Sequence, residues 1–193
     1  MAYMLKMSSE NSAEIYLHTA DDKTIAEELQ PHRVSFFHDP SCSVVSEEEI
    51  LSGALAESIK SRYPEIKNYF VEPLQVQTNT NDAAALSEAT QSRAHYYQEH
   101  THDENEAWYI QRGQVAFYLR LKDYVYIIIC TAGDFICVPG QTRHWFDAGA
   151  APSFFGLRFY LTLNAPVITG DKIALRYPQI EHAYSLIIRG ATL

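Results

Sequence analysis

The stretch of sequence that decides the fold reads QEHTHDENE over residues 98–106, and a second stretch reads PGQTRH over residues 139–144. Side chains two residues apart on a β-strand point to the same face, so His100 and His102 can share one metal ion. Glu106 follows four residues later, after a short polar turn. The first stretch therefore offers two imidazoles and a carboxylate to a single ion.

His144, the last residue of the second stretch, must reach this ion from a separate strand. The complete set of three imidazoles and one carboxylate leaves positions open on an octahedral metal, as expected of a metal that takes part in chemistry. Neutral imidazole suits iron, nickel, zinc and copper, and the absence of cysteine from both stretches disfavours a structural zinc site. The alternatives are an ion that only rigidifies the fold and a degenerate site that holds none.

The chain from residue 94 onward is rich in short runs of β-branched and aromatic residues. We predict strands over residues 94–99, 107–111, 114–121, 124–130, 134–138, 143–147 and 153–161. Turn-forming residues such as Gly113, Gly133 and Gly149 lie between these runs. Several short strands at this spacing indicate a sandwich or a barrel, so the predicted fold is mainly β.

Helical signals lie earlier in the chain. The Asp21-Asp22 pair can cap a helix that runs to Leu29 and ends at Pro31. Ser46 and Glu49 form a capping box ahead of apolar residues at helical spacing. We also predict a strand over 68–77, a polar loop over 78–82, one or two helical turns within 83–93, a strand over 166–174, and a strand or helix over 180–189.

Composition excludes several classes of function. The 193 residues carry a net charge of −9, which argues against nucleic-acid binding because phosphates require cations. The longest apolar run, from Val125 to Cys130, is too short to cross a bilayer, and no secretory signal begins the chain. Cys42, Cys130 and Cys137 show no CxxC spacing and fit a reducing compartment. We therefore expect a cytoplasmic protein without nucleic-acid or membrane partners.

The spacing of the two stretches resembles the two-part motif of the cupin superfamily. The first part runs from His102 through Glu106 to Gly113, and the second runs from Pro139 to His144. The resemblance implies a cupin-type barrel, a double-stranded β-helix or jelly roll, with N-terminal helices packed outside. It implies one domain over 1–193, with an N-terminal extension over 1–93 and a cupin core over 94–175.

Two residues depart from the cupin pattern. Gln141 stands two residues after the proline, where the pattern has glycine, and Gly140 lies one step early. Ala148 stands four residues after the final histidine, where the pattern has asparagine. Neither position supplies a metal ligand, so the metal prediction is unchanged.

The residues around the motifs are similar to a narrower family, the acireductone dioxygenases. The similarity rests on residues 99–106, on Val138-Pro139 and on the HWFD sequence of residues 144–147, and it extends to Tyr177-Pro178. It implies that O2 cleaves the acireductone 1,2-dihydroxy-3-keto-5-methylthiopentene in methionine salvage. The implied partners are this small-molecule enediol and O2, and the implied assembly is a monomer or a homodimer.

The family's metal ligands match His100, His102, Glu106 and His144 in this chain. The resemblance implies one Fe(II) or Ni(II) per chain. In the family, iron gives formate and the keto acid precursor of methionine, whereas nickel gives formate, carbon monoxide and methylthiopropionate. The bound metal thus selects the products.

Three further residues are candidates for the substrate site. Arg158 matches a pocket arginine of the family and would help to hold an enediol dianion; the alternative is that its side chain extends to solvent. Trp108 stands where the family generally has arginine, on the same strand face as Glu106 and so toward the pocket. Glu99, beside the first histidine ligand, is the candidate catalytic residue, as an orienting or proton-accepting group.

Trp108 leaves two alternative functions open, because it removes a charge partner for a dianion and narrows the cavity. One is a divergent paralogue that acts on a different enediol or hydroxyketone, and the other is a non-catalytic metal-binding cupin. His95 is predicted on the opposite strand face from the ligands. The remaining histidines are predicted at the surface, and most aromatic residues near the motifs are predicted in the core.

Overall fold

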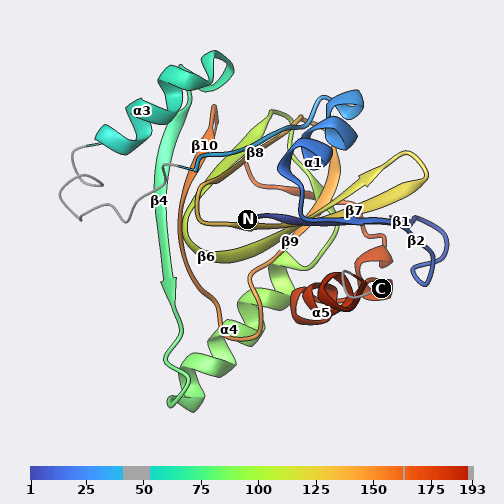
Figure 1. The fold of residues 1–193 in the computed structure, drawn as a ribbon. Helices are drawn as coiled ribbons and strands as arrows, with labels where there is room; N and C mark the ends of the chain where they lie inside the picture. The colour runs from blue at the N-terminus through green and yellow to red at the C-terminus, as the bar shows by residue number, and fades with distance from the viewer. Residues whose placement is uncertain (41–52, 163, 191–193) are drawn as a thin grey trace.

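The computed structural model describes residues 1–40, 53–162 and 164–190, and it is built around two antiparallel sheets that share one long strand (Figure 1). One sheet has the order β11-β5-β9-β6-β7-β1-β2, and the other has the order β3-β8-β6-β10-β4. The strands are β1 (Tyr3–Ser8), β2 (Ile15–Thr19), β3 (Ser35–His38), β4 (Phe70–Gln77), β5 (His100–Thr101), β6 (Glu106–Leu121), β7 (Tyr124–Thr131), β8 (Asp134–Val138), β9 (Arg143–Asp147), β10 (Ser153–Tyr160) and β11 (Val167–Ile168). The mainly β prediction is confirmed.

Strand β6 belongs to both sheets, because its first half pairs with β8 and β10 and its second half pairs with β7 and β9. The pairing with β10 shifts between Phe155 and Gly156, which leaves Gln111 as an extra residue on β6. Gly113 has φ +80°, and a Cβ there would lie 2.1 Å from the carbonyl oxygen of Ser153, so only glycine fits. Before this bulge, even-numbered residues such as Trp108 face the barrel interior. After it, odd-numbered residues such as Phe117 face the interior.

Three hydrophobic clusters fill the layers. The barrel interior contains the inward residues of both sheets, together with residues of helix α1 (Asp22–Leu29). A second cluster packs the outer face of the first sheet against helix α5 (Ile180–Gly190) and the short helix η3 (Ile173–Arg176). A third packs the other sheet against helix α3 (Ala54–Arg62) and η2 (Pro64–Ile66). Helices α3 and α5 thus cover the outside of the barrel (Figure 1).

The helix predicted from Asp21 is confirmed. The Asp21 side chain accepts a hydrogen bond of 2.9 Å from the backbone N–H of Thr24, and the short helix η1 (Gln30–His32), which contains Pro31, follows α1 directly. The capping box at Ser46 and Glu49 lies outside the described residues. Of the two alternatives for residues 180–189, the helix is correct, and the strand predicted over 166–174 is limited to β11.

The strand predicted over residues 94–99 is wrong. Helix α4 (Ala83–Tyr96) extends through the first half of this segment, and the Asp82 side chain caps it by accepting from the N–H groups of Ala84 and Ala85. The alanine-rich start favours a helix more than the tyrosines near its end favour a strand. The boundary predicted at residue 93 therefore falls inside a helix, and strands β1 to β4, which precede it, belong to the sheets.

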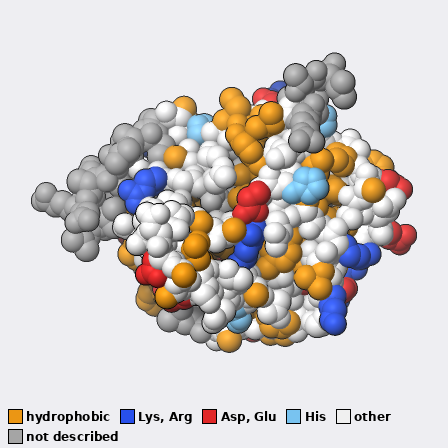
Figure 2. Space-filling view, turned by 90° about the horizontal axis from the view of Figure 1, so that it is seen from below, with side chains coloured by type: hydrophobic (Ala, Val, Ile, Leu, Met, Phe, Trp, Pro, Cys, Tyr) orange, Lys and Arg blue, Asp and Glu red, His pale blue; other side chains and the backbone are white. Residues whose placement is uncertain are grey.

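Charges of both signs are interspersed among apolar groups on the face seen from below in Figure 2. The described side chains visible there form no continuous basic stripe of the kind that binds phosphates. Among the described helices, none combines the length and apolarity needed to span a membrane.

Candidate metal centre

Three histidines meet at one end of the barrel, as the sequence predicts. His100 on β5 pairs directly with His144 on the neighbouring strand β9, and His102 follows in the turn after β5. The ring centroids of His100 and His144 lie 4.4 Å apart, and those of His100 and His102 lie 5.3 Å apart. One ligand nitrogen from each of the three residues lies within 4.8 Å of the others. This spacing allows one ion to bind all three.

Backbone carbonyls orient two of the imidazoles. Nδ1 of His100 lies 2.7 Å from the carbonyl oxygen of Gln98, and Nδ1 of His144 lies 2.8 Å from that of Thr142. A carbonyl oxygen only accepts hydrogen bonds, so Nδ1 must carry the proton in both rings. The lone pair is then on Nε2, which is free to bind a metal.

Burial favours the neutral form of the His100 and His102 rings. Burial, and then the neighbouring His144, lowers the pKa of His100 to about 4, and burial also lowers the pKa of His102. The Nε2 atom of His144 is buried and has no hydrogen-bond partner among the described residues. A metal ion would satisfy this nitrogen, so the histidines fit the group that the sequence predicts.

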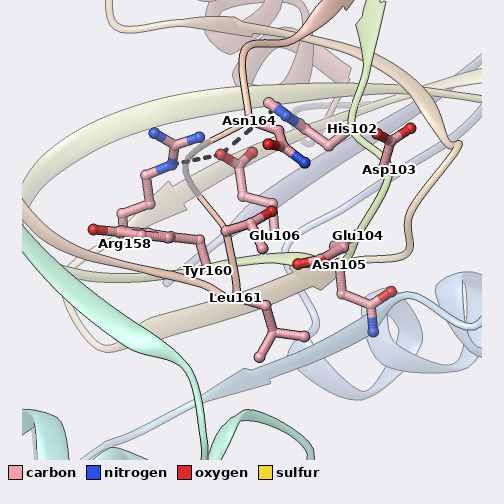
Figure 3. Close-up of a pocket in the computed structure, with 10 residues that line it drawn as sticks. His102, Asp103, Glu104, Asn105, Glu106, Arg158, Tyr160, Leu161 and Asn164 are labelled. Atoms are coloured by element: carbon pink, nitrogen blue, oxygen red, sulfur yellow. Dashed lines mark hydrogen bonds and ion pairs between the residues drawn. The ribbon is translucent and has the colours of Figure 1, made fainter.

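Glu106, the first residue of β6, faces the histidines. Its carboxylate oxygens lie 3.8 Å from Nε2 of His102 and 3.6 Å from Nε2 of His144. Nε of Arg158 on β10 donates a 2.7 Å hydrogen bond to the same carboxylate (Figure 3). Burial alone would raise the pKa of Glu106, but the adjacent His144 ring and the charge of Arg158 outweigh it and lower the pKa to about 2. The carboxylate is therefore ionised and ready to bind a cation.

The turn that departs from the cupin pattern packs against the ligand-bearing turn. Gln141 has φ +64° without being glycine, and its N–H donates to the carbonyl of His102 at 2.7 Å. Its side-chain amide reaches Asp103 at 3.1 Å. Gly140 allows the close approach, because a Cβ there would lie 2.6 Å from the carbonyl oxygen of Asp103. These hydrogen bonds compensate for the left-handed conformation of Gln141.

A cavity of about 690 Å³ opens from the histidines and Glu106 toward helix α4. Strands β4, β6, β9 and β10 form its other walls, and apolar and aromatic side chains supply much of its lining. Trp108 stacks on Phe146 in this wall, with ring centroids 5.6 Å apart and planes 19° apart. The arrangement places an ion-binding end and an apolar end in one cavity.

A sequence model of the ARD/ARD' family matches residues 3–165. The chain belongs to this family. An acireductone dioxygenase of Aquifex aeolicus is 36% identical over 88% of this chain and 92% of that protein. Acireductone dioxygenase 2 of Nocardia farcinica is 27% identical over 94% of this chain and 97% of its own length.

A solved structure shares the fold of this ARD/ARD' member. It is described as the acireductone dioxygenase from Bacillus anthracis with a cadmium ion in its active centre. The match has a TM-score of 0.65 and 18% identity, and it covers 86% of this chain and 99% of the other. The cupin-type barrel predicted from the sequence is thereby confirmed.

Two predicted substrate residues of this ARD/ARD' chain line the cavity. Arg158 and Trp108 are direct partners across β10 and β6, and the guanidinium carbon of Arg158 lies 6.0 Å from the centre of the Trp108 ring. Glu106 and Trp108 lie on the same face of β6, as their i, i+2 spacing predicts. The sequence did not reveal the ion pair between Arg158 and Glu106, whose partners are 52 residues apart.

Glu99 lies apart from the cavity lining. Its carboxylate is fully buried, where it accepts a 2.7 Å hydrogen bond from the Thr169 hydroxyl and lies 3.2 Å from Arg120. The Glu99 backbone carbonyl also accepts from the Thr169 N–H at 3.0 Å. These contacts anchor the chain that enters β5, so Glu99 supports His100 and does not face the cavity.

Sequence reasoning missed the part of the cavity that lies under α4. His95, Ala85 and Ala89 of this helix contribute to the lining, because the segment is helical and not extended. Leu74 and Val76 of β4 also contribute, and their alternation within the predicted strand over 68–77 was the available signal. The prediction of His95 on the opposite face of a strand is wrong for the same reason.

Proposed function

We propose that this chain is a metal-dependent dioxygenase that cleaves the acireductone 1,2-dihydroxy-3-keto-5-methylthiopentene with O2 in methionine salvage. Membership of the ARD/ARD' family supports the reaction. The observation that carries the proposal is the cluster of His100, His102 and His144 beside Glu106, at one end of a cavity. The enediol and O2 are the proposed partners, and the proposed location is the cytoplasm.

The four side chains would hold one Fe(II) or Ni(II) per chain, because imidazole suits both ions and a carboxylate adds negative charge. When bound, the ion would supply Lewis-acid polarisation and a template for two substrate oxygens. The buried, unpartnered Nε2 of His144 supports this assignment. A cadmium ion in the B. anthracis relative agrees with a divalent site and does not choose between iron and nickel.

The chain's own residues prepare the site in three ways. The carbonyls of Gln98 and Thr142 fix two imidazoles with Nε2 toward the centre. Arg158 holds the Glu106 carboxylate and presents a positive charge to the cavity, where an enediol anion would lie. Aromatic walls limit water near the reacting carbons. Glu99 acts in this proposal only by supporting the strand of His100.

Metal analysis combined with oxygen uptake tests the proposal. Protein loaded with iron or nickel is mixed with the acireductone without oxygen, and O2 is then admitted. We expect O2 consumption and formate from both forms, with carbon monoxide only from the nickel form. The His102→Ala variant should lose metal and O2 uptake while keeping its far-UV circular dichroism.

His182→Ala serves as the control, because His182 is exposed and lies on α5 away from the cavity lining. It should keep both metal and activity. If neither metal form of the unmodified protein consumed the acireductone, the proposed reaction would be wrong. Substrate binding without O2 uptake would then favour a non-catalytic cupin.

A further inference from the structure

The cavity continues well beyond the space around the metal ligands. From His100 and Glu106 it extends between β4 and α4 as far as Thr78 and Pro152, and its volume is about 690 Å³. Pockets of roughly 300–1,000 Å³ enclose drug-sized ligands. The methylthioethyl tail of the proposed substrate is a short, flexible chain, so it would occupy only part of this space.

The far part of the cavity is suited to an uncharged group. Leu74, Val76, Phe154, Ala85 and Ala89 contribute apolar surface there, beside polar and acidic side chains such as Gln77 and Glu88. Such a lining favours burial of hydrocarbon and disfavours burial of an unpaired charge. A ligand with a second charged group far from its enediol would therefore bind poorly.

The cationic side chains of the described lining are already paired. Arg93 on α4 donates to both carboxylate oxygens of Asp147 at 2.8 and 2.9 Å and to Glu181 at 2.7 Å. Arg158 donates to Glu106 at the ligand end. The far end consequently offers no spare cation among the described residues to an acidic tail.

Aromatic rings form a continuous wall from the ligand end into the far part. Phe146 is its centre: its ring lies 5.6 Å from Trp108, 5.3 Å from Phe117 and 6.1 Å from Phe154, measured between centroids. Trp108 itself is only 8% exposed and stands beside Glu106. Flat or extended hydrocarbon groups gain most from such a surface, through stacking and through area burial.

We propose, resting on the proposed function, that the site selects enediols with an extended or aromatic apolar tail in preference to the short methylthioethyl tail. The enediol oxygens lie at the histidine and Glu106 end, and the tail lies along Trp108 and Phe146 toward α4. Trp108 is a specificity-determining residue in this arrangement. Its apolar ring occupies a position from which a cationic side chain would attract a charged ligand.

A binding series tests the proposal without requiring turnover. The probes are 1-hydroxy-2-ketones with methylthioethyl, n-hexyl and phenylethyl tails, which present two oxygens but lack the enediol. Calorimetry on nickel-loaded protein should show the n-hexyl compound binding about tenfold more tightly than the methylthioethyl compound, because its tail is longer by two heavy atoms and each buried methylene raises affinity about three- to fourfold. The phenylethyl compound should also bind more tightly than the methylthioethyl compound. Affinity that stays constant or falls along the series would overturn the proposal.

A pair of variants on α4 locates the tail. Ala85 is half-buried and lines the far end of the cavity, whereas Ala84 is exposed on the same helix. Ala85→Phe should weaken hexyl binding about tenfold and leave methylthioethyl binding unchanged, because the added ring fills the tail space. Ala84→Phe should change neither. Equal losses for both probes in Ala85→Phe would contradict the proposed tail position.

The tail preference and the dioxygenase activity are tested by separate measurements, so either can fail alone. Rising affinity without O2 uptake from any acireductone would leave the tail preference standing and remove the dioxygenase assignment. O2 uptake with the methylthio substrate, together with constant affinity along the series, would do the reverse.

Discussion

The two ends of the cavity are lined by different kinds of side chain. At the ligand end, strands β5, β6 and β9 present polar side chains, and each is held by a specific hydrogen bond or ion pair. At the far end, helix α4 and strand β4 contribute apolar side chains such as Ala85, Ala89, Leu74 and Val76 to the wall. Strand pairing and hydrogen bonds fix the positions of the side chains at the first end, whereas packing contributes more at the second.

This difference assigns the chemistry to the ligand end and the selectivity for substrate tails to the far end. A metal requires several atoms at defined positions, so removal of one orienting partner should have a large effect. An apolar wall contributes in proportion to area, so its changes should have graded effects. We therefore expect substitutions at the ligand end to cause large losses of metal affinity, and substitutions at the far end to cause small losses of tail binding.

Among substitutions that leave the four metal ligands in place, the largest effect is expected from Arg158→Ala. Arg158 donates the 2.7 Å hydrogen bond that orients the Glu106 carboxylate, and loss of such a partner typically weakens metal binding by about 10–100-fold. Competition with a chelator would measure the change. Arg112→Ala is the control, since Arg112 is exposed on the same strand as Glu106. Unchanged nickel affinity in Arg158→Ala would mean that the carboxylate needs no orienting partner.

The next effect concerns pH and the metal-free protein. Unfolded His100 titrates near its ordinary pKa of 6.5, whereas burial lowers the folded pKa to about 4. Between these values the unfolded state binds more protons, so folding stability falls as the pH falls. We expect His100 alone to contribute a loss of about 2 kcal/mol between pH 7 and pH 5.

Urea unfolding of the metal-free protein at the two pH values would measure this loss. In His100→Gln the titrating group is gone, so the dependence on pH should become shallower. The same dependence in the variant and the unmodified protein would show that His100 does not carry the effect. Metal binding itself should require pH values at which the histidines are neutral.

The ligand end was largely predictable from the sequence, because its geometry follows from local rules. The i, i+2 spacing placed His100 beside His102, and Glu106 beside Trp108, on common faces. The meeting of His100 and His144 needed the order of the strands, which the cupin resemblance supplied. The pairing of Arg158 with Glu106 depended on register across β6 and β10, and no local pattern shows that register.

The far end was not predictable, because it depends on one helix. Tyr96 and Tyr97 favour a strand, but the Asp82 cap and the alanines after it favour the helix that is observed. Because residues 94–99 were predicted to form a strand, His95 and α4 were not predicted to line the site. The bulge at Gln111 reverses the inward parity of β6, and the only sequence signal near it was the turn-forming Gly113, two residues later.

The smallest effect is expected at the far end, in Phe154→Leu. Phe154 lines the cavity and contacts Phe146, whereas Phe155, the next residue, packs in the cluster outside the second sheet. Both residues are 5% exposed, so Phe155→Leu is a matched control. Each substitution should cost about 1 kcal/mol of stability, measured by urea unfolding.

Only Phe154→Leu should also weaken binding of the phenylethyl hydroxyketone, by a few fold, and it should leave nickel affinity unchanged because no metal ligand contacts depend on this ring. A loss of nickel affinity in Phe154→Leu as large as that in Arg158→Ala would contradict the division of the cavity into two ends. A few-fold loss confined to the tailed probe would instead show that the wall contributes by area, while the histidines and Glu106 contribute by position.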